Sequence, residues 1–122
     1  MTKKILIAIA LVLVLYFIFK APKIKNSSNA DIIFYYGEEC PHCHVVLKYI
    51  ADNKIDEKIK INSKEVYHNN VNKKELSDLA RICPEIMDTS GGIGVPIAFI
   101  IKENKCIGGD TPIIEKLQTM LK

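Results

Sequence analysis

Apolar and polar residues follow one another after residue 30 in an order that predicts four strands and three helices. Short apolar stretches bounded by polar residues or glycine predict strands at 31–36, 58–67, 95–101 and 105–107. Apolar residues recur at helical spacing in the segments between and after these strands, which are 41–52, 72–83 and 111–121. The resulting order, β-α-β-α-β-β-α, predicts an α/β fold. Its first two strands are joined by a helical crossover and are therefore expected to be parallel.

Residues 5–19 form an unbroken apolar run that has no polar face. As a helix this run would be about 22 Å long. That is shorter than the roughly 30 Å hydrocarbon core of a bilayer, but lysines that reach both interfaces would lengthen it. No small-residue cleavage site follows the run. We therefore expect residues 1–20 to be a retained signal anchor with a transmembrane helix, and a cleaved secretory signal peptide is the alternative.

The basic start of the chain favours a single-pass membrane protein with a cytoplasmic N-terminus and the following domain outside the cytoplasm. Removal of the segment would instead give a secreted protein. Residues 21–30 are polar and without periodicity, which predicts a linker to a domain of residues 31–122.

Charge is unevenly distributed along the chain. The first 30 residues contain five lysines and no acidic residue, whereas residues 31–122 contain 12 basic and 14 acidic residues. The net charge of +3 is therefore a property of the N-terminal segment. A mildly acidic domain argues against nucleic acid as a partner.

Candidate chemistry is concentrated in Cys40-Pro41-His42-Cys43, where the first strand gives way to the first helix. Two cysteines separated by two residues can be half of a zinc site, a redox pair or two structural thiols. A zinc site normally needs a second such pair, and the sequence has none. His42 and His44 nevertheless leave a mixed cysteine–histidine metal site as an alternative.

The redox interpretation follows from the position of Cys40 at the start of a helix, where Pro41 suits the first turn. Unpaired backbone N–H groups and the positive end of the helix dipole favour a thiolate there. We therefore predict that Cys40 is the attacking nucleophile and that Cys43, one turn further along, resolves the mixed disulfide. His42 would further stabilise the Cys40 thiolate, whereas His44 and His68 are expected to be ordinary surface residues.

The order of elements and three short motifs within residues 31–122 resemble the thioredoxin superfamily, and most closely its compact glutaredoxin branch. The motifs are Cys40-Pro41-His42-Cys43, Val95-Pro96 and Cys106-Ile107-Gly108-Gly109-Asp110. The resemblance implies a thioredoxin-like α/β fold with a mixed four-stranded sheet, a cis peptide bond before Pro96 that faces the cysteines, and Val95 backbone groups free to pair with an extended substrate. The substrate-binding residues that it implies are Pro41, Val95, Pro96, Gly108, Gly109 and Asp110.

Two features of the sequence modify what the resemblance implies. Glutaredoxins commonly carry a lysine shortly before the first cysteine that holds the glutathione carboxylate, but Gly37, Glu38 and Glu39 precede Cys40 here. Two acidic side chains would repel that carboxylate. We therefore expect no cofactor, with glutathione only as a candidate co-substrate. The Pro-His dipeptide between the cysteines is that of DsbA-type oxidases, which implies a strongly oxidising disulfide.

Together, these observations predict a membrane-anchored thiol–disulfide oxidoreductase that exchanges disulfides with protein thiols through Cys40 and Cys43 and is recycled by a separate redox partner. The alternatives are a glutathione-dependent glutaredoxin and a thioredoxin-like module that binds metal through the two cysteines and a histidine. The remaining cysteines are less informative. Cys83 lies on the apolar face of a predicted helix, so we expect a buried free thiol, with a Cys83–Cys106 disulfide as the alternative.

Overall fold

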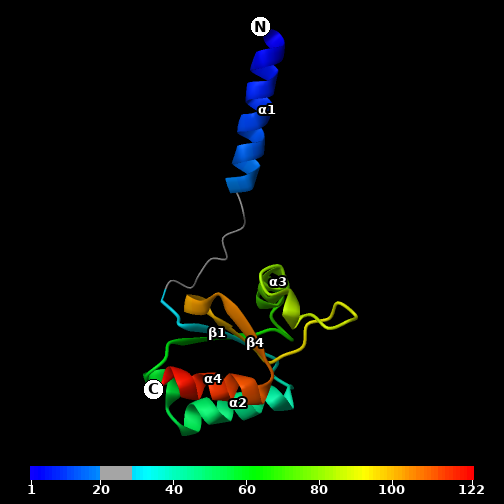
Figure 1. Cartoon of the computed structure of the whole chain (residues 1–122). Coiled ribbons are helices and arrows are strands. Elements are labelled where there is room, and N and C mark those ends of the chain that lie inside the picture. The colour runs from blue at the N-terminus through cyan, green and yellow to red at the C-terminus, as the bar shows by residue number, and fades with distance from the viewer. Residues whose placement is uncertain (20–28) are drawn as a thin grey trace.

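The computed structural model describes residues 1–19 and 29–122, and the side chains of residues 1–16 and 29–122. Its strands are β1 (Ile32–Tyr36), β2 (Ile61–Glu65), β3 (Ile97–Ile100) and β4 (Lys105–Gly108). Its longer helices are α1 (Thr2–Phe19), α2 (Pro41–Asp52), α3 (Asn70–Leu79) and α4 (Asp110–Met120) (Figure 1). The described connections also contain the 3-10 helices η1 (Ile55–Glu57), η2 (Pro84–Ile86) and η3 (Ile101–Glu103). From β1 onward the order of strands and longer helices is the predicted β-α-β-α-β-β-α.

The four strands form one mixed sheet in the order β2-β1-β3-β4. β1 runs parallel to β2, with Ile32 opposite Ile61, and antiparallel to β3, with Tyr35 opposite Ile97. β3 and β4 form an antiparallel hairpin. The predicted parallel crossover, the hairpin and the mixed four-stranded sheet are therefore confirmed.

β1 is buried on both faces because helices cover both sides of the sheet. Ile32 and Phe34 point into a core that includes residues of α2 and α4, whereas Ile33 and Tyr35 point into a core that includes residues of α3. Figure 1 shows α2 and α4 side by side on one side of the sheet and α3 on the other. Because β1 and β3 are antiparallel, the end of β1 lies beside the start of β3. The segment that leads to Cys40 leaves β1 there, and the Val95 segment enters β3 there.

Helix α1 corrects the prediction of a transmembrane helix. Across residues 1–19 and 29–122, no helix combines the length and the apolar content that crossing a bilayer requires. The physical reason is already visible in the sequence, since the apolar run of 5–19 gives only about 22 Å of helix against a hydrocarbon core of roughly 30 Å. The transmembrane part of the predicted fold is wrong, and the membrane anchoring derived from it is not supported. Most of the predicted linker, through residue 28, lies outside the described residues.

The start of α3 differs from the prediction by two residues because Asn69 caps the helix. The side chain of Asn69 accepts hydrogen bonds from the backbone N–H groups of Val71 and Asn72, at 3.1 and 3.0 Å. The helix therefore begins two residues before the predicted start at residue 72. An asparagine oxygen that satisfies two N–H groups of the first turn is sufficient to start the helix at Asn70.

Cys83 lies beyond the end of α3, which stops at Leu79, and its predicted free thiol is also wrong. The structure pairs it with Cys106 of β4 in a disulfide whose Cα atoms are 6.0 Å apart. Both residues are buried, and both belong to the core on the α3 side of the sheet. The disulfide therefore ties the loop after α3 to the edge strand of the sheet.

Candidate active site

Cys40 is the N-cap of α2, and its sulfur contacts the first turn of that helix. The backbone of Cys40 is extended, Pro41 occupies the first helical position, and the N–H of Cys43 points at the Cys40 sulfur at 3.2 Å. The two cysteines form a disulfide with their Cα atoms 5.3 Å apart. Cys40 is 5% exposed and Cys43 is fully buried. The predicted helix N-terminus at Cys40 is confirmed, and a sulfur at this position receives an N–H donor that favours its negative form.

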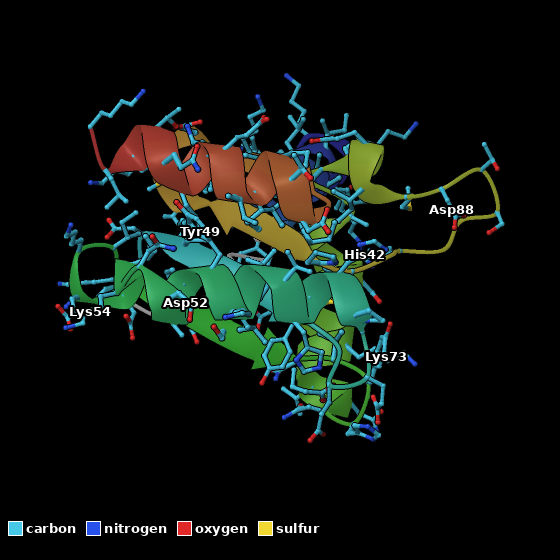
Figure 2. All side chains as sticks on the ribbon, turned by 90° about the horizontal axis from the view of Figure 1, so that it is seen from below. His42, Tyr49, Asp52, Lys54, Lys73 and Asp88 are labelled. Carbon is cyan, nitrogen blue, oxygen red and sulfur yellow. A yellow bond between two sulfur atoms is a disulfide. The ribbon has the colours of Figure 1, made fainter. Side chains whose placement is uncertain are left out.

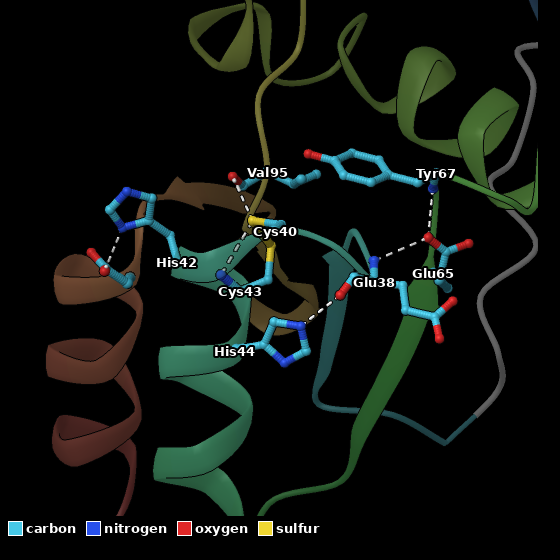
Figure 3. The surroundings of a disulfide bond; sticks show 9 residues. Glu38, Cys40, His42, Cys43, His44, Glu65, Tyr67 and Val95 are labelled. Carbon is cyan, nitrogen blue, oxygen red and sulfur yellow. Dashed lines mark hydrogen bonds and ion pairs between the residues drawn. A yellow bond between two sulfur atoms is a disulfide. The ribbon is translucent and has the colours of Figure 1, made fainter.

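The segment before β3 lies directly against the Cys40 sulfur. The Val95–Pro96 peptide bond is cis, as the resemblance implies. The carbonyl oxygen of Val95 is 3.6 Å from the Cys40 sulfur (Figure 3). In the reduced form a Cys40 thiol at this place could donate to that carbonyl. The N–H of Val95 has no hydrogen-bond partner among the described residues, so it is available to an extended segment that lies alongside.

A hydrogen bond between side chains joins the start of α4 to the start of α2. Gly109 is the N-cap of α4, with a φ of 91° that favours glycine, and its N–H donates to the Pro96 carbonyl at 3.0 Å. Asp110 takes the first helical position. Its Oδ1 accepts from the N–H of Thr111 at 2.7 Å and its Oδ2 lies 2.9 Å from His42 Nδ1. The hydrogen bond from His42, assisted by the Thr111 N–H, holds the pKa of the Asp110 carboxyl below its usual range.

His42 therefore points toward α4. Figure 3 shows its ring turned away from the disulfide, and no hydrogen bond within the described part of the chain joins it to either sulfur. The ring is largely exposed. Any effect of His42 on the Cys40 thiolate would have to act through its charge, and this role stays a prediction.

A cavity of about 310 Å³ lies beside the cis-proline segment. It is lined by Glu85, Ile86, Gly94, Val95, Pro96, Ile97, Cys106, Gly108 and Gly109. It brings together two of the predicted substrate-binding segments, Val95-Pro96 and Gly108-Gly109. Pro41 and Asp110 are not among its lining residues. Glu85 and Ile86 were missed from the sequence because the segment that carries them has no strand or helix periodicity.

No protein-family model matches the sequence, and no curated protein matches it significantly. The holo form of glutaredoxin C1 from Populus tremula x tremuloides is similar in structure, with a TM-score of 0.50, 22% identity, and coverage of 79% of this chain and 75% of that chain. A glutaredoxin from Archaeoglobus fulgidus is also similar, with a TM-score of 0.52, 19% identity, and coverage of 84% of this chain and 98% of that chain. The chain therefore has a thioredoxin-like α/β fold.

The segment that leads into Cys40 in this thioredoxin-like domain is anchored by the carboxylate of Glu65. Its two oxygens accept from the backbone N–H groups of Glu38, Tyr67, His68 and Asn69 at distances between 2.7 and 3.3 Å. Desolvation opposes ionisation of Glu65, but these four donors outweigh it and lower the pKa of the carboxyl. The end of β2 and the loop before Cys40 are thus held together by one side chain.

Three exposed side chains beside this loop have ligand atoms that could hold a metal ion. They belong to Glu38, Glu39 and His68, and these atoms lie within 4.8 Å of one another. His68 pairs with Glu39, whose hydrogen bond and charge raise the pKa of the imidazole. His44 contacts the Glu38 carbonyl instead. The metal site considered from the sequence would use Cys40, Cys43 and a histidine. The cluster found among the described residues contains neither cysteine.

Tyr67 is a residue near the disulfide that the sequence did not reveal. It follows β2, its side chain is about half exposed at 51%, and its ring rests on Gly37. A Cβ atom on Gly37 would lie only 2.4 Å from that ring. No local pattern links two residues that are this far apart in the sequence, so only the paired strands β1 and β2 bring them together.

Proposed function

We propose that the protein is a thiol–disulfide oxidoreductase that exchanges disulfides with protein thiols through Cys40 and Cys43. The observation that carries the proposal is the position of the Cys40 sulfur, which caps α2, receives the Cys43 N–H and is disulfide-bonded to Cys43. The likeness of the fold to two glutaredoxins supports it. The open N–H of Val95 beside the sulfur supports an extended protein segment as substrate.

The exchange begins at Cys40, because Cys43 is the more deeply buried sulfur. A substrate thiolate attacks the Cys40 sulfur, the Cys40–Cys43 bond breaks, and Cys43 leaves as a thiolate that takes up a proton. A second substrate thiolate then attacks the substrate sulfur of the mixed disulfide and releases Cys40 as a thiolate. The substrate loses two electrons and the cysteine pair gains them; reduction of a substrate disulfide is the same sequence in reverse.

The direction of net transfer depends on the potential of the pair relative to its compartment. The buried Cys83–Cys106 disulfide supports an oxidising compartment outside the cytosol, where such bonds persist. The Pro-His dipeptide supports the oxidising direction. A separate redox partner would return the Cys40–Cys43 pair to its starting state after each turnover.

Glutathione is the less favoured substrate. Glu38 and Glu39 are exposed beside Cys40, so they would meet its carboxylates with like charge. The Thr111 N–H at the start of α4 is already satisfied by the Asp110 side chain. These contacts favour protein thiols over a small anionic thiol.

The proposal is tested with wild-type protein, Cys40→Ser and Cys43→Ser in two assays, insulin reduction and oxidation of a dithiol peptide. We expect Cys40→Ser to lose both activities. Cys43→Ser should accumulate a mixed disulfide with the substrate, because the resolving thiol is missing. Full activity of Cys40→Ser would contradict the proposal, and a parallel assay with glutathione as the sole reductant would show whether a small thiol can replace the protein substrate.

A further inference from the structure

Tyr67 presents an exposed aromatic ring beside the proposed active site. Among the described residues 29–122, it is the only exposed phenylalanine or tyrosine. Its ring lies against Gly37, and the Gly37 carbonyl accepts from the Cys40 N–H at 3.1 Å. Figure 3 shows the ring extending toward Val95, whose carbonyl oxygen contacts the Cys40 sulfur. The ring therefore borders the place where a substrate must approach that sulfur.

The contact with Gly37 covers one face of the Tyr67 ring and leaves the other face open. A Cβ atom on Gly37 would lie 2.4, 2.5 and 2.6 Å from the ring atoms Cε2, Cζ and Cδ2. Three adjacent ring atoms are this nearly equidistant only from a point that lies over the face of the ring, and not from a point beyond its edge. With that face covered and Tyr67 still 51% exposed, the opposite face is open to solvent.

The position of Tyr67 is fixed relative to the loop before Cys40, although its side chain belongs to neither of the two cores. Its N–H donates to Glu65 at 2.7 Å, and the same carboxylate oxygen accepts from the N–H of Glu38 at 3.3 Å. An exposed aromatic ring on a fixed backbone beside a reactive group is typical of a binding surface. It offers a large contact area at little cost in conformational entropy.

The surroundings of the ring favour an uncharged partner. Figure 3 shows the Glu38 carboxylate directed away from the ring, and one of its oxygens lies within 4.8 Å of the His68 ligand atom. Glu39 also pairs with His68. The groups that link the ring to the sulfur are Gly37 and the half-buried Val95, which carry no side-chain charge. An apolar side chain therefore fits the open face of the ring better than a charged one.

We propose that Tyr67 is a specificity-determining residue whose open ring face binds an aromatic or large aliphatic side chain next to the reacting cysteine of an extended protein substrate. The proposal rests on the disulfide exchange proposed above and specifies the substrate class. The substrate backbone lies along Val95, whose N–H has no hydrogen-bond partner among the described residues. The substrate cysteine then faces Cys40 while the neighbouring side chain covers the ring and removes apolar surface from water.

The test compares single-cysteine peptides that differ in one residue, placed directly before or directly after the cysteine. This residue is phenylalanine, leucine, glutamine, lysine or glutamate. Each peptide thiolate attacks Cys40 of Cys43→Ser protein that carries ethanethiol in a mixed disulfide, so the bond between Cys40 and the peptide forms and ethanethiol leaves as a thiolate. Dividing each rate by the peptide's rate with diethyl disulfide removes differences between the peptide thiols themselves. In at least one of the two positions, we expect phenylalanine and leucine to react about 2- to 10-fold faster than glutamine, at low and high salt alike.

Variants of Tyr67 locate the preference. Tyr67→Ser and Tyr67→Gln, which remove the ring, should each reduce the phenylalanine-to-glutamine ratio by about half or more, whereas Tyr67→Phe should retain it. Leu121→Ser is the matched control, because it removes an exposed apolar side chain at the C-terminal end of α4. Figure 2 shows this end of α4 on the side of Lys54 and away from His42. The control should keep the wild-type ratio.

Equal normalised rates of the phenylalanine, leucine and glutamine peptides with the protein that retains Tyr67 would overturn this role of Tyr67 while leaving the proposed exchange activity intact. A preference that survives in folded Tyr67→Ser or Tyr67→Gln would also overturn it. So would a lysine or glutamate peptide that reacts faster than both apolar peptides, because it would identify a charged partner. Failure of every peptide to react, together with no activity of the wild-type protein on insulin, would instead remove the proposed function on which this role depends.

Discussion

His42 and Asp110 join the first turns of α2 and α4 across 68 positions of sequence, with Nδ1 and Oδ2 2.9 Å apart. The contact links the helix that carries the disulfide to the helix that follows the glycine pair. It also favours the ionised form of Asp110, because the hydrogen bond to His42, followed by that from the N–H of Thr111, lowers the pKa of the carboxyl. The stabilising effect of this contact is therefore expected to depend on pH in a definite direction.

We expect Asp110→Asn to be less stable than the wild type at neutral pH, and the difference to disappear in acid. A carboxyl whose pKa is lowered on folding stabilises the native state above its unfolded pKa of about 3.9, and this contribution is lost as the pH falls through the folded value. Thermal unfolding of both proteins from pH 7 down to pH 2 measures the effect. A stability difference that stays constant down to pH 2 would show that the carboxylate charge plays no part.

The Cys83–Cys106 disulfide is expected to stabilise the fold without carrying the proposed chemistry. The pair closes a loop with a sequence separation of 23, for which the loss of chain entropy in the unfolded state corresponds to about 3 kcal/mol. Cys83→Ala/Cys106→Ala should lower the free energy of unfolding by roughly this amount in urea titrations without reductant. The same variant should still form a mixed disulfide at Cys40. If the folded variant failed to do so, Cys40 and Cys43 would not be the reacting pair.

Gly37→Ala offers a test of the Tyr67 position that leaves the tyrosine itself unchanged. The added Cβ would lie 2.4 Å from the ring, so the ring must move, but an exposed ring can move at little cost. We expect a change in unfolding free energy below about 1 kcal/mol in urea titrations. A loss of more than about 2 kcal/mol would show instead that the ring cannot move aside and that its contact with Gly37 matters for the fold.

Glu75 joins α3 to two strands and is expected to matter for stability. Its Oε1 accepts from the Tyr35 hydroxyl at 2.8 Å, and it pairs with Lys64, which is largely buried. Burial, followed by the hydrogen bond and charge of Glu75, raises the pKa of Tyr35 far above its ordinary range. Glu75→Ala should cost about 2 kcal/mol because it leaves the Lys64 charge without its partner, whereas Tyr35→Phe should cost about 1 kcal/mol. Equal effects of the two variants in urea unfolding would contradict this order.

The elements were predictable where the local pattern is strong. Residues 32–36 are apolar without interruption, which is what a strand buried on both faces requires. The place of the Cys-Pro-His-Cys motif was predictable for the same reason, since Cys40 lies between that strand and an amphipathic helix that begins at Pro41. The start of α3 was less certain, because three asparagines at 69, 70 and 72 compete for the cap.

The contacts between distant segments could not be predicted from local patterns. Cys83 meets Cys106 only after the loop beyond α3 folds over the sheet, and His42 meets Asp110 only because α2 and α4 pack together. The transmembrane prediction had a different cause. It gave more weight to the apolar composition of residues 5–19 than to their length, and length decides whether a helix crosses a bilayer.

The acidity of the Cys40 thiol is the quantity on which the proposed chemistry most directly depends. It is measured in Cys43→Ser protein from the pH dependence of alkylation, with the Cys83–Cys106 disulfide intact and Cys40 as the only free thiol. The helix N-terminus and the Cys43 N–H predict a pKa clearly below the value of about 8.5 for free cysteine. A pKa at or above that value would contradict a thiolate stabilised at the start of α2, and with it the proposed disulfide exchange.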